Sequence, residues 1–423
     1  MDSGKKTLRI AVIGGGAAGC FCAIGVKRAR PDADVTVFEA GPRLLAKVAV
    51  TGGGRCNLTN SFRDVALSGR AEPGLMRLEE VYPRGAQLMR RALRVLSPAD
   101  TQRWFEAEGV RLTTQPDQCV FPVSQDAMQI VRTLERGLRE AGVSVVCNAP
   151  VERIEALPDG GFELTGPGDM PPYDRIIVTV GGNSQQKLQR LLPEGVEVTP
   201  CVPSLFTLKI PDAGLRALMG TVVEQAALSL AGTNFRSRGT LLLTDWGVSG
   251  PATLRLSSYA ARHLAGCQYT GTLHINWLDA TEAEARAWIA AAAAGDARKQ
   301  AASTPPPGIT ARLWRHLLGR AGLREDLRWA ELGGKGAARL AATLTADAYP
   351  VAGRARFKEE FVTCGGVALM GISINTLESK FFPGLFFAGE ALDLDAVTGG
   401  FNLQAAWSTA AVVAGALAAS DAA

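Results

Sequence analysis

Three glycines near the amino terminus have the types and spacing that bind a dinucleotide. Gly14, Gly16 and Gly19 follow the apolar, β-branched run 8–13 in the pattern G-x-G-x-x-G. In a strand-turn-helix unit the first glycine allows a tight turn and the second lets the backbone approach a pyrophosphate. The third lets the helix pack closely on the strand. The pattern therefore predicts a nucleotide-binding turn between a buried parallel strand and a helix.

A helix and a carboxylate complete this pattern. Residues 17–29 have helical periodicity, so the N–H groups of the first turn, at Ala17 and Ala18, would face the phosphates. Glu39 ends the next apolar run and lies 20 residues beyond Gly19, where a carboxylate accepts hydrogen bonds from a ribose diol. The carboxylate favours an unphosphorylated ribose and leaves the choice between NAD and FAD open.

A second glycine-rich segment, T-G-G-G-R-C-N at 51–57, follows soon after. Consecutive glycines cost chain entropy, which a loop tolerates where its backbone passes close to something flat or charged. Arg55 could meet a phosphate or a carboxylate there, and Asn57 could hydrogen-bond a ring edge. A flexible surface loop is the alternative interpretation. The candidate residues of this segment are Gly53, Gly54, Arg55, Cys56 and Asn57.

Two later apolar runs also end in glycine. Run 176–180 leads into Gly181, and run 385–388 leads into Gly389, before a T-G-G-F-N-L-Q segment at 398–404 opens the last helix. The carboxyl ends of parallel strands lie at one edge of a doubly wound sheet, where the cofactor binds. We therefore predict an α/β fold in which these segments meet at one Rossmann-like sheet.

Composition narrows the protein class. The 423 residues, 47% of them hydrophobic and 20% charged, are those of a globular protein of two or three domains. The net charge of +4 neither requires nor excludes a nucleic-acid partner. Eight scattered cysteines without C-x-x-C indicate reduced thiols in a cytoplasmic protein, and three unpaired histidines give no reason to expect a metal. We find no uninterrupted apolar run of the length that spans a membrane and expect 405–419 to be a buried helix.

The cofactor prediction depends on the number of G-x-G-x-x-G motifs in the sequence. A reductase with two resident nucleotides normally has a second G-x-G-x-x-G motif for NAD(P)H, and this sequence has one motif. We therefore expect a resident FAD enclosed by the other glycine segments. NADH or NADPH would then visit as a transient reductant, or the substrate would itself reduce the flavin.

The motifs together resemble a known family. VIGGGAAG, TGGGRCNLTN, LLLTDWGVSGPATLRLS and LFFAGEALDLDAVTGGFNLQAAWSTA are similar to segments of the YhiN/BaiN-type, or aminoacetone-oxidase-like, bacterial flavoproteins, and the similarity extends over nearly the whole chain. The resemblance implies a discontinuous FAD domain at 1–194 and 362–423. A β-barrel-like domain at 195–275 and 346–361 and a helical domain at 276–345 would be inserted into it, in agreement with the change from alternating elements to strands near 193.

The resemblance also implies roles for single residues. It places Gly14, Gly16 and Gly19 at the pyrophosphate and Glu39 at the adenosine ribose, and it lines the flavin with Arg55, Cys56 and Asn57. By the same resemblance Gly389, Glu390 and Asp393 would lie by the ribityl chain and phosphate, and Gly400, Phe401 and Asn402 near the pyrimidine edge of the ring.

The reaction is left with several alternatives. The family's activities suggest an NAD(P)H-fed reductase of an activated C=C bond in a small molecule or nucleobase, an aminoacetone-like amine oxidase using O2, or an enzyme that forms dihydrouridine in ribosomal RNA. A flavin-binding protein without catalytic activity is a further alternative. Reduction needs a proton donor, and the candidates are Cys56, Asp245 and Tyr259. Cys56 as a packing residue and Asp245 as a turn cap are the competing interpretations. The sequence predicts no membrane partner and no oligomeric state.

Overall fold

The chain folds as two compact units. The computed structural model describes residues 7–67, 72, 74–168, 170–355 and 362–419. Residues 1–202 together with 362–423 form the first unit, and residues 203–361 form the second. The three-domain boundaries expected from the sequence, with a helical domain at 276–345, stay a prediction.

A five-stranded parallel sheet is the centre of the first unit. Its strand order is β20-β11-β1-β2-β8. The strands are β1 (Arg9–Ile13), β2 (Asp34–Phe38), β8 (Ser144–Val146), β11 (Arg175–Val178) and β20 (Leu385–Phe387). Strands β1, β11 and β20 consist mainly of β-branched and aromatic residues buried on both faces, as parallel strands covered by helices require. Because all four pairings are parallel, the carboxyl ends of the five strands lie at one edge.

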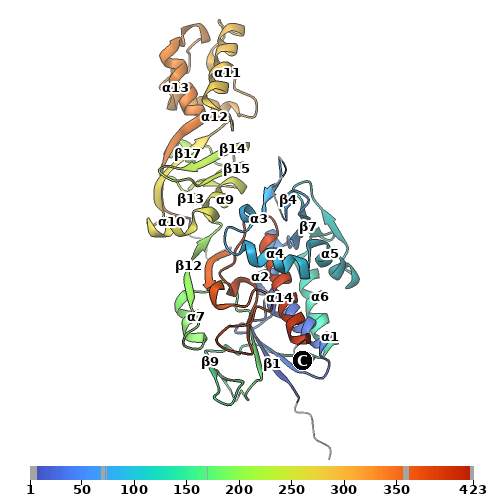
Figure 1. Cartoon of the computed structure of the whole chain (residues 1–423). Coiled ribbons are helices and arrows are strands. Elements are labelled where there is room, and N and C mark those ends of the chain that lie inside the picture. The colour runs from blue at the N-terminus through green and yellow to red at the C-terminus, as the bar shows by residue number, and fades with distance from the viewer. Residues whose placement is uncertain (1–6, 68–71, 73, 169, 356–361, 420–423) are drawn as a thin grey trace, which may run out of the picture. The chain divides into compact units, whose positions relative to one another are not determined.

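Helices from both ends of the chain pack on one another beside this sheet. Helix α1 (Ala17–Ala29) contacts α14 (Phe401–Ala419) and α6 (Ala127–Ala141), and α14 also contacts α4 (Ala86–Val95) (Figure 1). The ring centroids of Phe21 on α1 and Trp407 on α14 lie 5.4 Å apart. Among the described residues, α14 alone is long and apolar enough to cross a membrane, but 67% of its most apolar 18-residue stretch is buried inside the protein. It is therefore placed as a core helix.

Shorter elements complete the first unit. Its remaining helices are α2 (Ala46–Gly54), α3 (Leu78–Val81), α5 (Pro98–Ala107), α7 (Gln185–Leu191), η3 (Leu369–Gly371) and η4 (Gly389–Ala391). The remaining strands are β3 (Thr59–Asn60), β4 (Val65–Ala66), β5 (Met76–Arg77), β6 (Leu112–Thr114), β7 (Cys119–Pro122), β9 (Arg153–Ala156), β10 (Phe162–Thr165) and β19 (Val362–Val367). Strand β12 (Val198–Ser204) begins in this unit and ends in the second. Residues 356–361, the end of the expected β-barrel-like domain, lie outside the described residues.

The second unit is built on a six-stranded antiparallel sheet that closes on itself. Its order is β13-β16-β15-β14-β17-β18, and a bridge from Leu208 to Arg354 joins the two edges. The strands are β13 (Leu208–Lys209), β14 (Val222–Leu230), β15 (Arg236–Leu243), β16 (Gly247–Ser249), β17 (Thr270–Asn276) and β18 (Asp347–Ala352). Helices α8 (Ala213–Arg216), α9 (Pro251–Tyr259) and α10 (Ala261–Gly266) accompany it. Closure removes exposed sheet edges, so the strands form a barrel.

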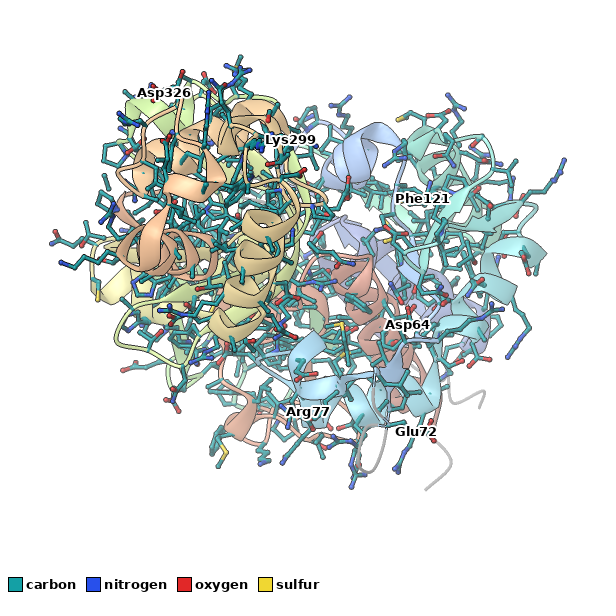
Figure 2. All side chains as sticks on the ribbon, turned by 90° about the horizontal axis from the view of Figure 1, so that it is seen from above. Asp64, Glu72, Arg77, Phe121, Lys299 and Asp326 are labelled. Atoms are coloured by element: carbon teal, nitrogen blue, oxygen red, sulfur yellow. The ribbon has the colours of Figure 1, made fainter. Side chains whose placement is uncertain are left out.

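A helical layer shares one hydrophobic core with this barrel. It consists of α11 (Glu282–Gly295), η1 (Ala301–Ser303), α12 (Ala311–Arg320), η2 (Trp329–Glu331) and α13 (Gly333–Ala346). Buried residues of the strands and of these helices belong to the same cluster, in which the ring of Trp288 packs on Trp314 and Trp329. Lys299 and Asp326 are exposed on this layer, where Figure 2 labels them.

Local hydrogen bonds and backbone geometry set the limits of three segments. Helix α6 begins at Ala127, because the side chain of Asp126 accepts the N–H of Met128 and caps it there. Helices α9 and α10 are separated by a break at Ala260. The segment 51–57 adjoins helical turns, and its backbone leaves the helix at Thr51 before a left-handed stretch begins.

Candidate functional site

The nucleotide-binding turn is shaped by two glycines that tolerate no side chain. Gly14 has φ +108°, and a Cβ there would lie 2.6 Å from the carbonyl oxygen of Thr179. A Cβ on Gly19 would overlap the carbonyl oxygen of Gly14. The hydroxyl of Thr179 donates to that same carbonyl at 2.8 Å. Strand β1, the end of β11 and the start of α1 therefore approach each other as closely as backbone allows.

Gly16 serves a different purpose at the same turn. It has φ −82° and ψ −166°, and a Cβ on it would meet nothing within 4 Å. The first turn of α1, all of whose residues are described, contains no acidic side chain, and Gly16 provides no side-chain cap. The space beside Gly16 is thus open at the end of the helix whose N–H groups attract a phosphate.

Glu39 lies at the end of β2, directly beside the turn. Its Oε2 accepts the N–H of Gly15 at 2.8 Å, and its Oε1 accepts the N–H of Gly41 at 2.7 Å. These two hydrogen bonds fix the carboxylate at the carboxyl edge of the sheet. Each oxygen keeps a second lone pair, so the carboxylate could still accept hydrogen bonds from a ribose.

The glycine-rich segment 51–57 forms a left-handed turn. Gly52, Gly53 and Gly54 have φ values of +60°, +69° and +81°, and a Cβ on Gly53 or Gly54 would meet open space. Arg55 donates from Nε to the carbonyl of Gly52 at 3.2 Å, and its guanidinium lies 4.6 Å from the ring centroid of Phe121, which Figure 2 labels. This backbone is available only to glycine without strain.

Asn57 connects this turn to the carboxyl-terminal part of the chain. With its amide oriented so that both atoms have partners, Nδ2 donates to the carbonyl of Thr59 at 2.9 Å and Oδ1 accepts the N–H of Gly400 at 3.1 Å. Gly400 has φ +87°, and a Cβ there would overlap the carbonyl of Thr59. The two glycine segments, far apart in the sequence, are therefore adjacent.

Phe401 and Asn402 hold the start of α14 in place. The carbonyl of Phe401 accepts the hydroxyl of Tyr82 at 2.9 Å. The Asn402 side chain accepts the N–H of Ala396 at 2.9 Å and donates to the carbonyl of the same residue at 3.0 Å. Both residues thus shape the loop that precedes the helix.

Gly389, Glu390 and Gly181 meet beside the first turn of α1. A Cβ on Gly389 would lie 2.8 Å from Cβ of Ala18, and one on Gly181 would lie 3.7 Å from Oε2 of Glu390. Asp393 follows on the same segment, and its N–H donates to the carbonyl of Val367 at 2.9 Å. These residues continue the edge that begins at Gly14.

The residues of the first unit fit an FAD molecule. The open N-terminus of α1 would hold the pyrophosphate, the carboxylate of Glu39 would hold the ribose, and the left-handed glycine turn with Gly400 would border the flavin. These assignments, with Ala17 and Ala18 in the first turn of α1, stay a prediction. The structure brings Gly389 to Ala18 and Asn57 to Gly400.

The candidate proton donors are divided between the two units. Cys56 is fully buried in the first unit, and this burial raises the pKa of its thiol to about 12, so it stays protonated at neutral pH. Asp245 is exposed in the second unit, where its carbonyl accepts a hydrogen bond from Nε of Arg216. Tyr259 is half-buried at the end of α9. Their role in catalysis stays a prediction.

Several site residues were missed by the sequence reasoning. Nζ of Lys47 lies 3.7 Å from Oε2 of Glu390, and the N–H of Thr363 donates to Oε1 of Glu390 at 2.9 Å. Gln404 bonds the hydroxyl of Thr59 across 345 positions. Thr179 could have been noticed because it ends a buried strand just before Gly181. Lys47, Thr363 and Gln404 have partners so distant in sequence that no local pattern indicates their contacts.

Comparison with known proteins identifies the family. Residues 8–416 match the HI0933-like protein Rossmann domain family. The chain is 27% identical over 417 residues to a 3-dehydro-bile acid delta(4,6)-reductase of Clostridium scindens, covering 95% of this chain and 97% of the relative. It is also 27% identical over 424 residues to a ribosomal RNA dihydrouridine synthase of Haemophilus influenzae, covering 94% and 96%.

The matches among solved structures have much lower sequence identity. A 3-ketosteroid delta1-dehydrogenase of Sterolibacterium denitrificans is 12% identical, with a TM-score of 0.49 over 98% of this chain and 100% of that one. The family match extends over nearly all of the 423 residues, as the resemblance in the sequence predicts. The chain therefore belongs to the HI0933-like Rossmann family and is an FAD-dependent oxidoreductase.

Proposed function

We propose that this protein reduces an activated C=C bond with electrons that NADH or NADPH delivers to the resident FAD. The observation that supports the proposal is the dinucleotide-binding turn of the first unit, where the carboxylate of Glu39 accepts the N–H of Gly15 at 2.8 Å beside Gly14 and the open space at Gly16. The names of the two relatives, a bile acid delta(4,6)-reductase and a dihydrouridine synthase, both denote hydrogen added to an unsaturated ring.

The cofactor supplies two-electron chemistry when bound, accepting hydride from a nicotinamide and donating it to a substrate. The residues of this chain provide the rest. Gly16 and the first turn of α1 would bind the phosphates, Glu39 would orient the ribose, and the 51–57 turn would help to exclude water from the flavin. A proton must also reach the carbon next to the reduced one, for which Cys56, Asp245 and Tyr259 are the candidates.

The substrate is proposed as a small conjugated carbonyl compound, with a uridine base in ribosomal RNA as the second candidate. The first candidate corresponds to the substrate named for the bile acid reductase. The second corresponds to the substrate named for the ribosomal RNA dihydrouridine synthase. The second unit holds more Lys and Arg than Asp and Glu, which favours an anionic partner, although charged helix faces also serve solubility.

Anaerobic reduction of the purified flavoprotein tests the proposed electron donor. We expect NADH or NADPH to bleach the flavin absorbance, and a conjugated enone added afterwards to restore it. Flavin that neither nicotinamide bleaches would refute the proposed function. Peroxide formed from aminoacetone in air, without any reaction with nicotinamides, would instead indicate an amine oxidase.

A comparison of acceptors tests the substrate class. Reduced enzyme is mixed with a 3-oxo-4-ene steroid, with free uridine or with ribosomal RNA, and flavin reoxidation is followed. Reoxidation by the steroid alone supports the first candidate, and reoxidation by RNA alone supports the second. The same assay on Cys56→Ala, Asp245→Asn and Tyr259→Phe identifies a proton donor as the variant whose reoxidation slows while its reduction by nicotinamide does not.

A further inference from the structure

Glu390 is a carboxylate held beside the place where phosphates would bind. Its Oε1 accepts the N–H of Thr363 at 2.9 Å, which fixes the side chain. A Cβ on Gly182 would lie 2.7 Å from the same oxygen, so the backbone after β11 passes directly against the carboxylate. The side chain is 25% exposed. Glu390 therefore has little freedom to turn away.

The segment that carries Glu390 touches the start of α1. The neighbouring Gly389 packs against Ala18, since a Cβ on Gly389 would lie 2.8 Å from the Cβ of Ala18. The N-terminus of α1 is the end that attracts a phosphate. A pyrophosphate bound there would have a carboxylate as its neighbour, and like charges at close range repel each other.

Lys47 provides the compensating charge. Its Nζ lies 3.7 Å from Oε2 of Glu390, and its side chain is 70% exposed. The first turn of α2 carries Lys47, and this helix is tied to the nucleotide-binding turn because the N–H of Leu45 donates to the carbonyl of Gly15 at 2.8 Å. An ion pair this exposed adds little to folding stability. Because the ion pair lies beside the expected phosphate site, it can affect the binding of the cofactor instead.

We propose that Lys47 is a positioning residue for the cofactor, which neutralises Glu390 so that an anionic dinucleotide binds next to this carboxylate. The proposal rests on the assignment of the α1 N-terminus as the pyrophosphate site. Lys47 acts through Glu390 and not through a direct contact with phosphate. Its removal therefore weakens FAD binding only while Glu390 carries its charge.

The test measures FAD dissociation constants by titrating deflavinated protein and following flavin fluorescence. At low salt, Lys47→Met should raise the dissociation constant about fivefold, the upper range for an exposed ion pair. Lys47→Arg should leave it near the original value. Lys187→Met, which removes an exposed lysine of α7 in the same unit, is the matched control and should have no effect.

A double variant separates the proposed role from a direct one. In a Glu390→Gln background, Lys47→Met should no longer raise the dissociation constant, and high salt should reduce the effect of the single variant because salt screens exposed charges. An unchanged constant in Lys47→Met, or an equal loss in both backgrounds, would overturn the proposal. Glu39→Ala tests the dinucleotide site independently: its failure to weaken FAD binding would refute the site assignment and not the role of Lys47 alone.

Discussion

Glycine has two different functions within one motif of this protein. At Gly14 and Gly19 the absence of a side chain allows backbone segments to touch, whereas at Gly16 it leaves space for a ligand. The same residue type thus permits close packing at two positions, and we propose that it permits cofactor binding at the third. The spacing of the three glycines is consistent with both functions. The atoms that an added Cβ would meet at each position distinguish between them.

Two alanine substitutions test this difference. Gly19→Ala should lower the free energy of unfolding of the cofactor-free protein by about 1–3 kcal/mol, because its Cβ would overlap the carbonyl of Gly14. Gly16→Ala, at a φ that alanine adopts freely, should leave this free energy unchanged and weaken FAD binding. Urea unfolding and FAD titration measure the two effects. A large loss of stability in Gly16→Ala would contradict the assignment.

The thiol of Cys56 should resist alkylation in the folded protein. Burial raises its pKa to about 12, so at pH 7.5 almost none of it is thiolate, the form that reacts with alkylating agents. We expect iodoacetamide to label the exposed Cys267 and to spare Cys56, as peptide mass spectrometry would show. Rapid labelling of Cys56 in native protein would show that its surroundings open far more readily than this burial implies.

At the scale of elements, the segment before α14 is fixed by contacts with the segment before α4. Arg84 forms an ion pair with the fully buried Asp395, including a bond from Nε to Oδ1 at 2.6 Å. The N–H of Val397 donates to the carbonyl of Val81 at 2.9 Å, and Tyr82 bonds Phe401. These contacts hold Gly400 against Asn57, so the geometry of the site depends on them.

Breaking the Arg84–Asp395 pair should destabilise the first unit. Arg84→Met leaves a buried carboxylate without its charge partner, for which we expect a loss of about 3–5 kcal/mol in the free energy of unfolding. Glu155→Ala, which breaks an exposed pair with Arg153, is the control and should cost less than about 1 kcal/mol. Adding Asp395→Leu to Arg84→Met should restore part of the loss. Equal effects of Arg84→Met and the control would contradict the importance of the buried pair.

In the second unit, a histidine couples the helical layer to the barrel. Nε2 of His316 on α12 lies 3.1 Å from the hydroxyl of Tyr349 on β18. Burial lowers the pKa of His316 below its usual 6.5, although Asp212 and Asp347 oppose this. The folded protein therefore favours the neutral ring more than the unfolded chain does.

This lowered pKa predicts a loss of stability on acidification. The stabilising contribution is complete above the unfolded pKa near 6.5 and disappears as the pH falls through the lower folded pKa, because the unfolded state then binds more protons. We expect His316→Gln to flatten the dependence of unfolding on pH between about 5 and 7.5. Tryptophan fluorescence would follow unfolding at each pH. His263→Gln, which changes an exposed histidine, is the control. A dependence that His316→Gln leaves unchanged would refute this role.

At the scale of the whole molecule, the chain leaves the first unit and returns to it through neighbouring strands. The N–H of Ala368 donates to the carbonyl of Glu197 at 2.9 Å, and a Cβ on Gly365 would lie 2.8 Å from the Cα of Cys201. Strands β12 and β19 pair in this way, so residues 202 and 362 lie close together. An inserted domain whose ends are adjacent can be removed with little change to the rest.

We therefore expect the first unit to fold and bind FAD by itself. A chain of residues 1–202 joined to 362–423 by a flexible linker of about four residues should bind FAD with an affinity within about tenfold of the full-length value, because the proposed cofactor residues from Gly14 to Asn402 all lie in it. Flavin retention after gel filtration and circular dichroism would measure binding and folding. A folded but colourless product that does not take up added FAD would contradict the assignment of the site.

The sequence by itself determined those parts of the site that depend on neighbouring residues. The turn from Gly14 to Gly19 and the carboxylate of Glu39 belong to one strand-helix-strand unit, in which spacing fixes geometry because the strand and helix periods are constant. The same holds for the buried parallel strands and for most of the helices. Family resemblance added the association with FAD, which spacing alone left open.

Only the tertiary structure decided which distant residues meet. Asn57 reaches Gly400, Gly389 reaches Ala18 and Lys47 reaches Glu390 because α14 packs on α1 and brings the two ends of the chain to one sheet edge. Packing between helices depends on the shapes of whole apolar faces, and no local pattern encodes it. The burial of Cys56 and of the Arg84–Asp395 pair follows from this packing as well, so their chemistry could be inferred only after the fold was known.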